Sequence, residues 1–552
     1  MKLEGFIPYD AKAAQLYDKR RWWLGLTLGG MFDKASDVYP SQEALVGGDR
    51  RYTYGELRRL VDRMAYNLLK EGLQRGDRVL LQLPNWPEFV ISYFAVQKAG
   101  LIAVLLTVNH TSREVNHLAA LTQPAAWIVP ARYRKIDYQA QVEEVRQKHP
   151  ELKKVIVVGE DVPAGCLRFD GFLDTKAAVN EIKAVLEEAA PEPTDVCQIL
   201  PSGGTTGLPK GAPRTHNDYI CNVEYKSRAW HLNVTDSCLV ASTVGHNLAL
   251  LVCVTGPIFH GAKVVLVDST LPQDFCQLVQ DERITCTGLV PTLISRIASF
   301  DRLADYDLSS LSRIYVGAAN SPPDLVRQVE DKIGCRYINA FGMVEGPCAQ
   351  TRPDAPLELR CATIGRPVCP YDELVTLGPN GEKTPPGVEG ELAAKGPGIF
   401  TGYVNNPKAN KDSFTPDGYF RTGDLAVIDK DGCIRITGRI KDIIIRGGEN
   451  IAAQEVEELI SSHPLVEYVS VVGMASADLG EELCAYIQPV PGATVSHTDI
   501  INHLQQIGAS KLFFPARTEV MDQLPLTAAG KVDKKALRAD IAEKQRAEEQ
   551  LK

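Results

Sequence analysis

The sequence predicts an α/β protein in which a large N-terminal region forms a wound, mostly parallel sheet. Residues 51–130 alternate between helical and strand patterns, and a second series of strands and helices begins at Leu200. The pattern changes at Asp372 to short strands separated by turns, and again after Gly438 to a compact mixture of helices and strands. These changes predict wound α/β segments, then a β-rich subdomain, and then a small α+β region.

The first series consists of apolar strands joined by amphipathic helices. Gly72 and Gly100 end the first two helices, and the buried strands are continuous apolar runs. Ligands of such sheets bind at the carboxyl ends of the strands, where the segment after Leu200 would lie. The expected helices cover residues 51–73, 87–100 and 112–123, and the expected strands cover residues 78–84, 101–107 and 125–130.

The later parts of the chain show comparable patterns. After the segment at Leu200, strands are expected at residues 240–244, 262–267, 286–290 and 313–317, with a helix at 324–334. Residues 378–382, 385–390 and 429–432 are the turns of the β-rich subdomain. Beyond Gly438 we expect helices at 452–463 and 496–508, strands at 466–474 and 482–490, and a charged, solvated helix from 534 to the end.

Bulk composition limits the classes of function. With 552 residues the chain needs two or three domains, and its formal net charge of −9 argues against nucleic acid as a partner. The 13 cysteines are scattered and include no CxxC pair, which indicates reduced thiols rather than disulfides or structural zinc. No apolar run approaches the ~20 residues of a membrane span, and the N-terminus lacks the pattern of a signal peptide. We therefore expect a cytoplasmic protein with no membrane partner.

The segment Leu200–Gly211, LPSGGTTGLPKG, is typical of an anion cradle. Its glycines allow close backbone approach, Ser202, Thr205 and Thr206 are hydroxyl donors, and Lys210 is a cation. A P-loop NTPase is disfavoured because Lys210 follows proline and precedes glycine, so no adjacent hydroxyl can hold Mg²⁺. A flexible loop is the alternative for such a run taken alone.

The cradle resembles the phosphate loop of the adenylate-forming superfamily, which includes acyl-CoA synthetases, luciferases and the adenylation domains of peptide synthetases. Further motifs of that family follow in the same order: Gly317–Ala319, Asn339–Gly346, Gly390–Tyr403, Tyr419–Asp424, Gly438–Asp442 with Arg446–Ile451, and Pro525–Lys534. The resemblance implies an N-terminal adenylation domain of two wound α/β subdomains plus a β-rich one, residues 1–438. A small mobile α+β lid, residues 439–552, completes the implied fold.

The resemblance also implies the reaction: a carboxylate attacks the α-phosphorus of ATP, giving an acyl-AMP and pyrophosphate. The nucleotide would be bound by Ser202, Gly203, Gly204, Thr205, Thr206, Gly207, Lys210, Gly317, Ala318, Ala319, Asn339, Phe341, Gly342, Asp424 and Arg439. Within this set Phe341 would stack near the adenine, and Asp424 would accept both ribose hydroxyls. Gly317–Ala319 is equally consistent with a tight strand-to-helix turn.

The implied catalytic residues are Lys531, Glu345 and His246. Lys531 would bridge the substrate carboxylate and the α-phosphate, and Glu345 would reach Mg²⁺ held on the phosphates. Lys441 corresponds to the hinge of the lid, and Gly447 and Gly448 would line a channel for a pantetheine thiol. Val344 departs from the usual threonine, which removes a hydroxyl contact to phosphate. No tightly bound prosthetic group is expected beside ATP and Mg²⁺.

Stand-alone aryl-acid AMP ligases, the 2,3-dihydroxybenzoate and salicylate activators of siderophore assembly, are the subgroup that this chain most resembles. The resemblance rests on GFIPYD, LQLPNWPEFV, residues 213–219 and Gly245–Asn247. It implies aryl-acid contacts at His246, Asn247, Val252 and Cys348. Dihydroxybenzoate enzymes have serines where this chain has Leu251 and Val252, and an unpaired buried hydroxyl costs ~1–3 kcal/mol. We therefore expect an acid without a 3-hydroxyl, such as salicylate or benzoate.

Two acceptors remain open for the acyl group, an aryl carrier protein and coenzyme A. The sequence shows no carrier or condensation domain beside the adenylation motifs, so it favours neither acceptor. A non-catalytic nucleotide-binding protein on this fold is a further alternative. It would predict loss of Lys531, Glu345 or Asp424, and all three are present.

Overall fold

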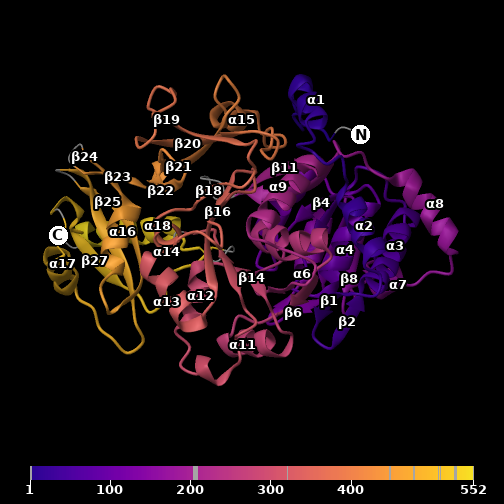
Figure 1. Ribbon diagram of the computed structural model, residues 1–552, viewed down its shortest axis with the longest axis horizontal. Helices are drawn as coiled ribbons and strands as arrows, with labels where there is room; N and C mark the ends of the chain where they lie inside the picture. The colour runs from indigo at the N-terminus through magenta and orange to yellow at the C-terminus, as the bar shows by residue number, and fades with distance from the viewer. Residues whose placement is uncertain are drawn as a thin grey trace. The chain divides into compact units, whose positions relative to one another are not determined.

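The computed structural model describes residues 3–202, 209–319, 321–446, 449–476, 479–507, 509, 511–527 and 531–550. The chain divides into two compact units (Figure 1). Unit 1 consists of Met1–Cys361, Gly365–Glu373 and Ala394–Phe420, and unit 2 consists of Ala362–Ile364, Leu374–Ala393 and Arg421–Lys552. This division groups the β-rich segment with the C-terminal residues. The boundary between an adenylation domain and a lid after Gly438 therefore stays a prediction.

The first sheet of unit 1 confirms the wound arrangement predicted for residues 51–130. Its strands are rich in valine, isoleucine and leucine and are parallel, with the exception of the edge strand β11. In spatial order the strands are β11 (Lys210–Thr215), β10 (Val196–Ser202), β4 (Ile102–Leu105), β3 (Arg78–Leu81), β5 (Ala126–Pro130), β8 (Lys154–Val158) and β9 (Leu167–Arg168).

The second sheet of unit 1 holds the later strands that the sequence predicted. Strands β12 to β16 pair in parallel, and β16 continues into an antiparallel edge. In spatial order the strands are β18 (Arg366–Pro367), β17 (Cys348–Gln350), β16 (Arg336–Gly342), β15 (Arg313–Val316), β14 (Cys286–Leu289), β12 (Ser237–Val240), β13 (Lys263–Leu266), β1 (Glu43–Gly47) and β2 (Arg50–Thr53).

One expectation about the cradle was wrong. The segment at Leu200 does not begin the second sheet, because β10 pairs in parallel with β4 of the first sheet through Gln198 and Ile199. It then turns back as β11 to form a hairpin at the sheet edge. The strand pattern of β10 was visible in the sequence, but pairing between strands separated by some ninety residues was not.

Helices surround the two sheets (Figure 1), and the buried apolar residues of unit 1 form several clusters. The long helix α3 begins at a capping box in which Thr53 and Glu56 exchange hydrogen bonds. The helices of unit 1 include α1 (Ala11–Lys19), α2 (Leu28–Val38), α3 (Tyr54–Lys70), α4 (Pro87–Lys98), α5 (Ser112–Thr122), α6 (Gln139–Lys148), α7 (Asp170–Leu173), α8 (Val179–Ala189), α9 (His216–Ala229), α10 (Gly256–His260), α11 (Pro272–Asp281), α12 (Pro291–Ala298), α13 (Pro323–Ile333) and α15 (Pro407–Ser413).

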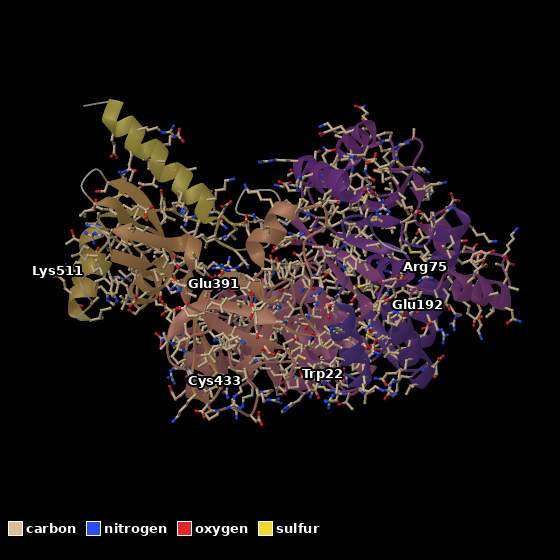
Figure 2. All side chains as sticks on the ribbon, turned by 90° about the horizontal axis from the view of Figure 1, so that it is seen from above. Trp22, Arg75, Glu192, Glu391, Cys433 and Lys511 are labelled. Atoms are coloured by element: carbon tan, nitrogen blue, oxygen red, sulfur yellow. The ribbon has the colours of Figure 1, made fainter. Side chains whose placement is uncertain are left out.

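Helix α9, which follows the hairpin strand β11, is buried along most of its length. It begins at a second capping box, formed by Thr215 and Asp218. The start of β10 is also fixed, because the Asp195 carboxylate accepts a hydrogen bond from Arg75 at 2.5 Å and another from the backbone N–H of Glu192. Arg75 and Glu192 are labelled in the side-chain view of Figure 2. The hairpin and α9 are therefore held at both ends.

The N-terminal segment is attached to the loop at residues 397–401. Tyr9 Oη donates to the carbonyl oxygen of Ile399 at 2.5 Å, and Trp23 Nε1 donates to that of Pro397 at 2.8 Å. The two rings also pack edge to face, with centroids 5.0 Å apart. These contacts brace a loop that reaches the site described below.

Unit 2 contains the predicted β-rich segment and the predicted α+β region. The four-stranded sheet consists of β19 (Glu373–Leu377), β20 (Glu389–Lys395), β21 (Phe420–Ile428) and β22 (Ile434–Arg439). The other sheet consists of β24 (Glu449–Ala452), β23 (Ile443–Arg446), β26 (Gly480–Pro489), β25 (Val466–Ser476) and β27 (Arg517–Val520). The helices of this region are α16 (Ala453–Ser461), α17 (His497–Gln506) and α18 (Lys534–Gln550).

The terminal helix α18 differs from its expected solvated character. Leu537 and Ile541 are buried and pack with Val472 and Tyr486 of the neighbouring strands. These two apolar residues lie four positions apart and so share one helix face. The many charged residues around them hid this face in the sequence. Among the described residues, no helix has the length and apolar character that a bilayer crossing requires.

Candidate active site

The predicted cradle is the loop of the β10–β11 hairpin. Ser202 and Lys210 are paired across the two strands and mark the ends of this loop. Gly203, Gly204, Thr205, Thr206 and Gly207 were also predicted to bind the nucleotide, and they lie outside the described residues. The contacts of Ser202 and Lys210, which flank these residues, therefore locate the site.

Glu345 meets both the hairpin and Tyr403. Its side chain is only 1% exposed, and its Oε1 accepts hydrogen bonds from Ser202 Oγ and from Tyr403 Oη, the latter at 2.7 Å. Lys210 Nζ lies over the Tyr403 ring, 4.5 Å from the centroid. Ser202 thus contacts the residue predicted to act with Mg²⁺ directly, whereas Lys210 contacts Tyr403, which donates to that residue.

Tyr403 stays a hydrogen-bond donor to this carboxylate. Burial raises the pKa of the Tyr403 hydroxyl, and the nearby charge of Glu345 raises it further. A phenol with a raised pKa keeps its proton throughout the neutral range. At this contact Tyr403 is therefore the donor and the Glu345 carboxylate oxygen the acceptor.

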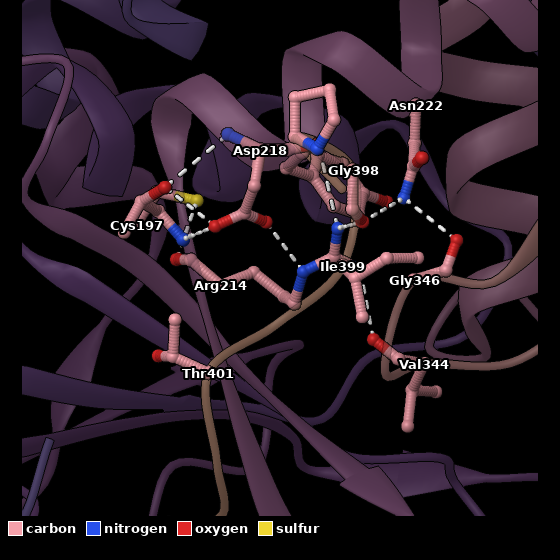
Figure 3. A network of polar contacts seen from close by, with 12 residues as sticks. Cys197, Arg214, Asp218, Asn222, Val344, Gly346, Gly398, Ile399 and Thr401 are labelled. Atoms are coloured by element: carbon pink, nitrogen blue, oxygen red, sulfur yellow. Dashed lines mark hydrogen bonds and ion pairs between the residues drawn. The ribbon is translucent and has the colours of Figure 1, made fainter. Parts of the chain in front are cut away.

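The backbone around Glu345 is held by Arg214, which has no exposed surface (Figure 3). Its guanidinium donates to the carbonyl oxygen of Val344 at 2.8 Å and to that of Gly398 at 2.8 Å, and its Nε donates to Asp218 Oδ1 at 2.5 Å. Asp218 is 1% exposed and also caps α9. A buried cation with a buried counter-ion thus fixes the residue directly before Glu345.

Asn222 holds the other side of Glu345. Its Nδ2 donates to the carbonyl oxygens of Gly346 at 3.2 Å and Gly398 at 3.0 Å (Figure 3). Gly346 has φ of +117°, and a Cβ there would lie 2.1 Å from the Gly398 carbonyl oxygen. Only glycine fits this close approach, which explains the Glu-Gly pair of the motif.

Asp372 is a buried carboxyl beside this network. Its Oδ1 accepts a hydrogen bond from the backbone N–H of Gly398 at 2.9 Å, whereas Oδ2 has no hydrogen-bond partner among the described residues. Burial raises the pKa of the Asp372 carboxyl to about 7, and the Gly398 bond and the charge of Arg214 only partly oppose that rise. The carboxyl therefore changes its charge within the neutral pH range.

The residues predicted to contact the aromatic acid lie around two short segments. His246 Nδ1 accepts from the backbone N–H of Leu248 at 3.3 Å, and Asn247 Oδ1 accepts from Tyr219 Oη at 3.0 Å. Tyr219 thus fixes the amide of Asn247, so its N–H groups are the part suited to meet a substrate oxygen.

A π-helical segment, η1 (Ala249–Thr255), continues from Asn247 and carries Val252. A Cβ on Gly288 would lie 3.1 Å from Val252 Cγ1 and 3.5 Å from Leu248 Cδ2. On β16 and β17, a Cβ on Gly342 would lie 3.6 Å from Cys348 Sγ. Val252 therefore packs closely against the backbone at Gly288, and Cys348 lies at ordinary contact distance from the Cβ position of Gly342.

The predicted adenine segment forms a strained turn after β15. Ala318 has φ of +74°, in the left-handed region that residues with a Cβ rarely adopt. Gly317 lies next to the neighbouring strand, since a Cβ there would be 3.1 Å from the Ala340 carbonyl oxygen. Asn339 is 5% exposed and its N–H donates to Thr351 Oγ1 at 2.9 Å, so it is a structural part of β16, while Phe341 is half-buried.

Unit 2 brings together the predicted ribose, hinge and lysine residues. Asp424 Oδ1 accepts from Arg439 Nε at 2.5 Å, and Asp424 Oδ2 is buried without a hydrogen-bond partner among the described residues. Burial raises the pKa of the Asp424 carboxyl, while the charges of Arg439, Lys531 and Lys441 oppose the rise. Lys531 is therefore near enough to Asp424 to act on its charge.

The predicted hinge residue Lys441 follows β22 in a short 3₁₀ turn. Burial lowers the pKa of Lys441, and the neighbouring Arg439 lowers it further. The next residue, Asp442, accepts from Arg538 of α18 at 2.7 Å. The thiol-channel residues Gly447 and Gly448 lie outside the described residues.

Comparison with known proteins decides the family. A model of the AMP-binding enzyme matches residues 32–404, and a model of the AMP-binding enzyme C-terminal domain matches residues 455–531. The chain belongs to the AMP-binding enzyme family.

Relatives of this AMP-binding enzyme match along nearly the whole chain. A salicylyl-CoA synthase/salicylate adenylyltransferase of Streptomyces is 36% identical, with 98% of each chain covered. A 2,3-dihydroxybenzoate-AMP ligase of Bacillus subtilis is 35% identical, also with 98% of each covered. The apo structure of Mycobacterium smegmatis MbtA, 34% identical, covers 97% of this chain and 98% of its own with a TM-score of 0.74.

Several residues that build the site of this AMP-binding enzyme were not predicted from the sequence. Arg214, Asp218 and Asn222 hold the backbone on both sides of Glu345, and Asp372 lies beside them. One signal was present, because Asp218, Asn222 and Lys226 follow one another at intervals of four and so share a face of α9. Polar residues on one face of an otherwise buried helix indicate a polar site.

Proposed function

We propose that this chain activates an aromatic carboxylic acid with ATP and passes the product to the phosphopantetheine thiol of an aryl carrier protein. A carboxylate oxygen attacks the α-phosphorus, the bond between the α-phosphorus and its bridging oxygen breaks, and pyrophosphate leaves with that oxygen. The observation that carries the proposal is the buried Glu345, which accepts hydrogen bonds from Ser202 and Tyr403, while Lys210 lies over the Tyr403 ring. A carboxylate beside a glycine-rich hairpin loop is suited to a metal-bound triphosphate.

In this proposal the cations of the chain offset the charge of two reacting anions. Lys210 faces the β- and γ-phosphates, and Lys531 joins the substrate carboxylate to the α-phosphate. Asp424 accepts the ribose hydroxyls through Oδ2, the atom that lacks a hydrogen-bond partner among the described residues. Arg439, which holds Oδ1, keeps that second oxygen oriented.

Mg²⁺ fits the residues near the hairpin. Among the described residues, no group of three or more histidines, cysteines, aspartates and glutamates could enclose a metal. Mg²⁺ is commonly held by one or two carboxylates together with substrate phosphates, and Glu345 offers one such carboxylate. When bound, the ion would neutralise phosphate charge, while Ser202 and Tyr403 keep Glu345 in place.

The aromatic acid is the substrate class that relatives and residues both favour. The two relatives above are named for salicylate and 2,3-dihydroxybenzoate. In this chain Leu251 and Val252 are 3% and 1% exposed, and neither can pair with a hydroxyl. We therefore infer a preference for acids without a 3-hydroxyl, such as salicylate or benzoate.

Transfer to coenzyme A is the second candidate for the acceptor. One relative is named a salicylyl-CoA synthase and another a naphthoate–CoA ligase, whereas a Mycobacterium tuberculosis relative is named a salicyl-AMP ligase/salicyl-S-ArCP synthetase.

We infer a cytoplasmic setting, because all the cysteines are free and all but Cys166 are buried.

The decisive experiment is acid-dependent ATP–pyrophosphate exchange over a panel of benzoates. We expect exchange with salicylate or benzoate to exceed that with 2,3-dihydroxybenzoate by about tenfold or more, the factor that an unpaired buried hydroxyl predicts. A clear preference for 2,3-dihydroxybenzoate would overturn the substrate assignment. Thioester formation with a phosphopantetheinylated carrier protein and with coenzyme A separates the two acceptors.

A further inference from the structure

Helix α9 carries a buried lysine that the proposed reaction does not use. Lys226 is 4% exposed and lies one turn beyond Asn222 on the same face of the helix. Within the described part of the chain, no carboxylate lies within ion-pairing distance of Lys226 Nζ, whereas the buried Arg214 has Asp218. A buried ammonium without a counter-ion is costly, so its retention calls for a partner.

The neighbours of Lys226 are polar but uncharged. Nζ donates to Tyr315 Oη at 2.6 Å and lies 4.8 Å from the centroid of the Tyr315 ring. Burial lowers the pKa of Lys226, but Cys348 and Tyr315 outweigh it and bring the pKa to about 12. An ammonium has three N–H donors, of which Tyr315 takes one and the Cys348 thiol lies close enough to take a second, so a third is left for a ligand.

Lys226 reaches the surroundings of the predicted aryl pocket. A Cβ on Gly342 would lie 3.3 Å from Lys226 Nζ and 3.6 Å from Cys348 Sγ, and Gly342 is exposed. The ammonium thus lies beside the exposed Gly342, which has no side chain, and near the predicted wall residue Cys348. Tyr315 contacts both Lys226 and the predicted adenine segment, because its ring is 3.4 Å from the Cβ position of Gly317.

The two sides of this pocket differ in chemistry. Leu248 and Val252 face Gly288 on the apolar side, and Leu248 also approaches Gly317. On the other side stand the Lys226 ammonium and the Tyr315 hydroxyl. Since Tyr315 Oη accepts from Lys226, its own proton can be donated elsewhere. Two donors, one of them charged, therefore point to a ligand oxygen that accepts hydrogen bonds.

We propose that Lys226 and Tyr315 recognise a hydroxyl or carboxylate oxygen on the ring of the aromatic acid, away from the reacting carboxylate. The inference rests on the proposed function and narrows its substrate class to ring-substituted polar acids. It is compatible with the absence of a hydroxyl partner at Leu251 and Val252, because the two donors are carried by α9 and β15 and not by that segment. Unsubstituted benzoate would leave the ammonium without its acceptor.

The first test compares acids on the wild-type enzyme. ATP–pyrophosphate exchange is measured with benzoate, with its 2-, 3- and 4-hydroxy forms and with the three benzene dicarboxylates. We expect at least one polar acid to exceed benzoate in kcat/KM by about 10- to 100-fold, the effect of a charge-assisted hydrogen bond. If benzoate equals or exceeds every polar acid, the inference is overturned while the proposed function stands. Absence of exchange with every aromatic acid overturns the proposed function and the inference with it.

The second test removes the donors. Lys226→Met should lower kcat/KM for the polar acid by about 10- to 100-fold more than kcat/KM for benzoate, and Tyr315→Phe should reduce the preference by about tenfold. Arg228→Met, an exposed cation on the same helix, is the matched control and should leave the preference intact. An equal loss with polar acids and benzoate in both variants would assign Lys226 a purely structural role. Should Lys226→Met fail to fold, Tyr315→Phe and the wild-type panel decide.

Discussion

Tyr403 donates its phenolic proton to Glu345 across 2.7 Å, and this bond joins the loop after β20 to the turn between β16 and β17. The same carboxylate oxygen accepts from Ser202 at the end of β10. A single oxygen of Glu345 thus collects three segments that are far apart in the sequence.

Replacing Tyr403 with phenylalanine should weaken both the fold and the use of Mg²⁺. The buried Glu345 loses one of two donors, which should lower the free energy of unfolding by about 1–3 kcal/mol and raise the Mg²⁺ concentration needed for half-maximal exchange. Urea unfolding and a Mg²⁺ titration measure the two effects. Tyr66→Phe, which removes a tyrosine–glutamate bond to Glu181 elsewhere in unit 1, should leave the Mg²⁺ dependence unchanged. An unaltered Mg²⁺ requirement in Tyr403→Phe would count against the metal role of Glu345.

The Arg214–Asp218 pair should show strong coupling. Arg214→Met leaves the Asp218 carboxylate buried without its cation and frees the carbonyls of Val344 and Gly398, so we expect a loss of about 3–5 kcal/mol in unfolding free energy. The double variant Arg214→Met/Asp218→Asn should recover part of that loss. Denaturant unfolding of the full double-mutant cycle gives the coupling. Additive effects of the two single changes would show that the charges act independently.

Asp372 should make stability fall as pH rises through neutrality. Burial raises the pKa of its carboxyl to about 7 in the folded protein, whereas an unfolded aspartate has a pKa of about 4. The folded state therefore holds a proton that the unfolded state releases. This contribution to stability is complete below pH ~4 and is lost as pH rises through about 7.

Asp372→Asn removes this titration and provides the measurement. Between pH ~5.5 and ~8 the wild type should lose about 2 kcal/mol more unfolding free energy than the variant. At the higher pH the variant should be the more stable of the two, because its amide needs no desolvated charge. Parallel pH profiles for both proteins would assign Asp372 an ordinary pKa.

Asp424 should confer a preference for ribose. The wild-type enzyme is expected to use ATP about 10- to 100-fold better than 2′,3′-dideoxy-ATP. The dideoxy nucleotide has no ribose hydroxyl that could donate a hydrogen bond to Asp424 Oδ2. Asp424→Ala should lose most of this discrimination, with a higher KM for ATP. The exposed Asp431→Ala is the control. Retained discrimination in Asp424→Ala would place the ribose site elsewhere.

Lys531 should separate the two half-reactions. A unit charge at ~4 Å in an effective dielectric of ~20 is worth about 4 kcal/mol, so Lys531→Ala should lower adenylation about a thousandfold. Thioester formation from preformed acyl-AMP should persist, because that step does not need the α-phosphate bridged to a carboxylate. The exposed neighbour Lys535→Ala serves as the control in both assays. Normal pyrophosphate exchange in Lys531→Ala would contradict the catalytic assignment.

The sequence by itself determined the local elements and the motifs. Apolar runs and helical spacing predicted the parallel strands of unit 1 and the helices α3, α4 and α5, because these patterns depend on neighbours within a few residues. The same holds for the glycines and the lysine around the hairpin loop, and for Glu345, whose motif identified the family. Such signals are read one segment at a time.

Only the tertiary structure decided which segments meet. Three contacts join residues from distant parts of the chain. Strand β10 pairs with β4, Arg214 and Asn222 donate to backbone carbonyls beside Glu345, and Lys226 donates to Tyr315. The spacing of Asp218, Asn222 and Lys226 marks a polar face of α9, but it does not show which carbonyls or side chains that face meets. Burial costs a charge its hydration, and the partners that offset this cost come together only when the chain folds.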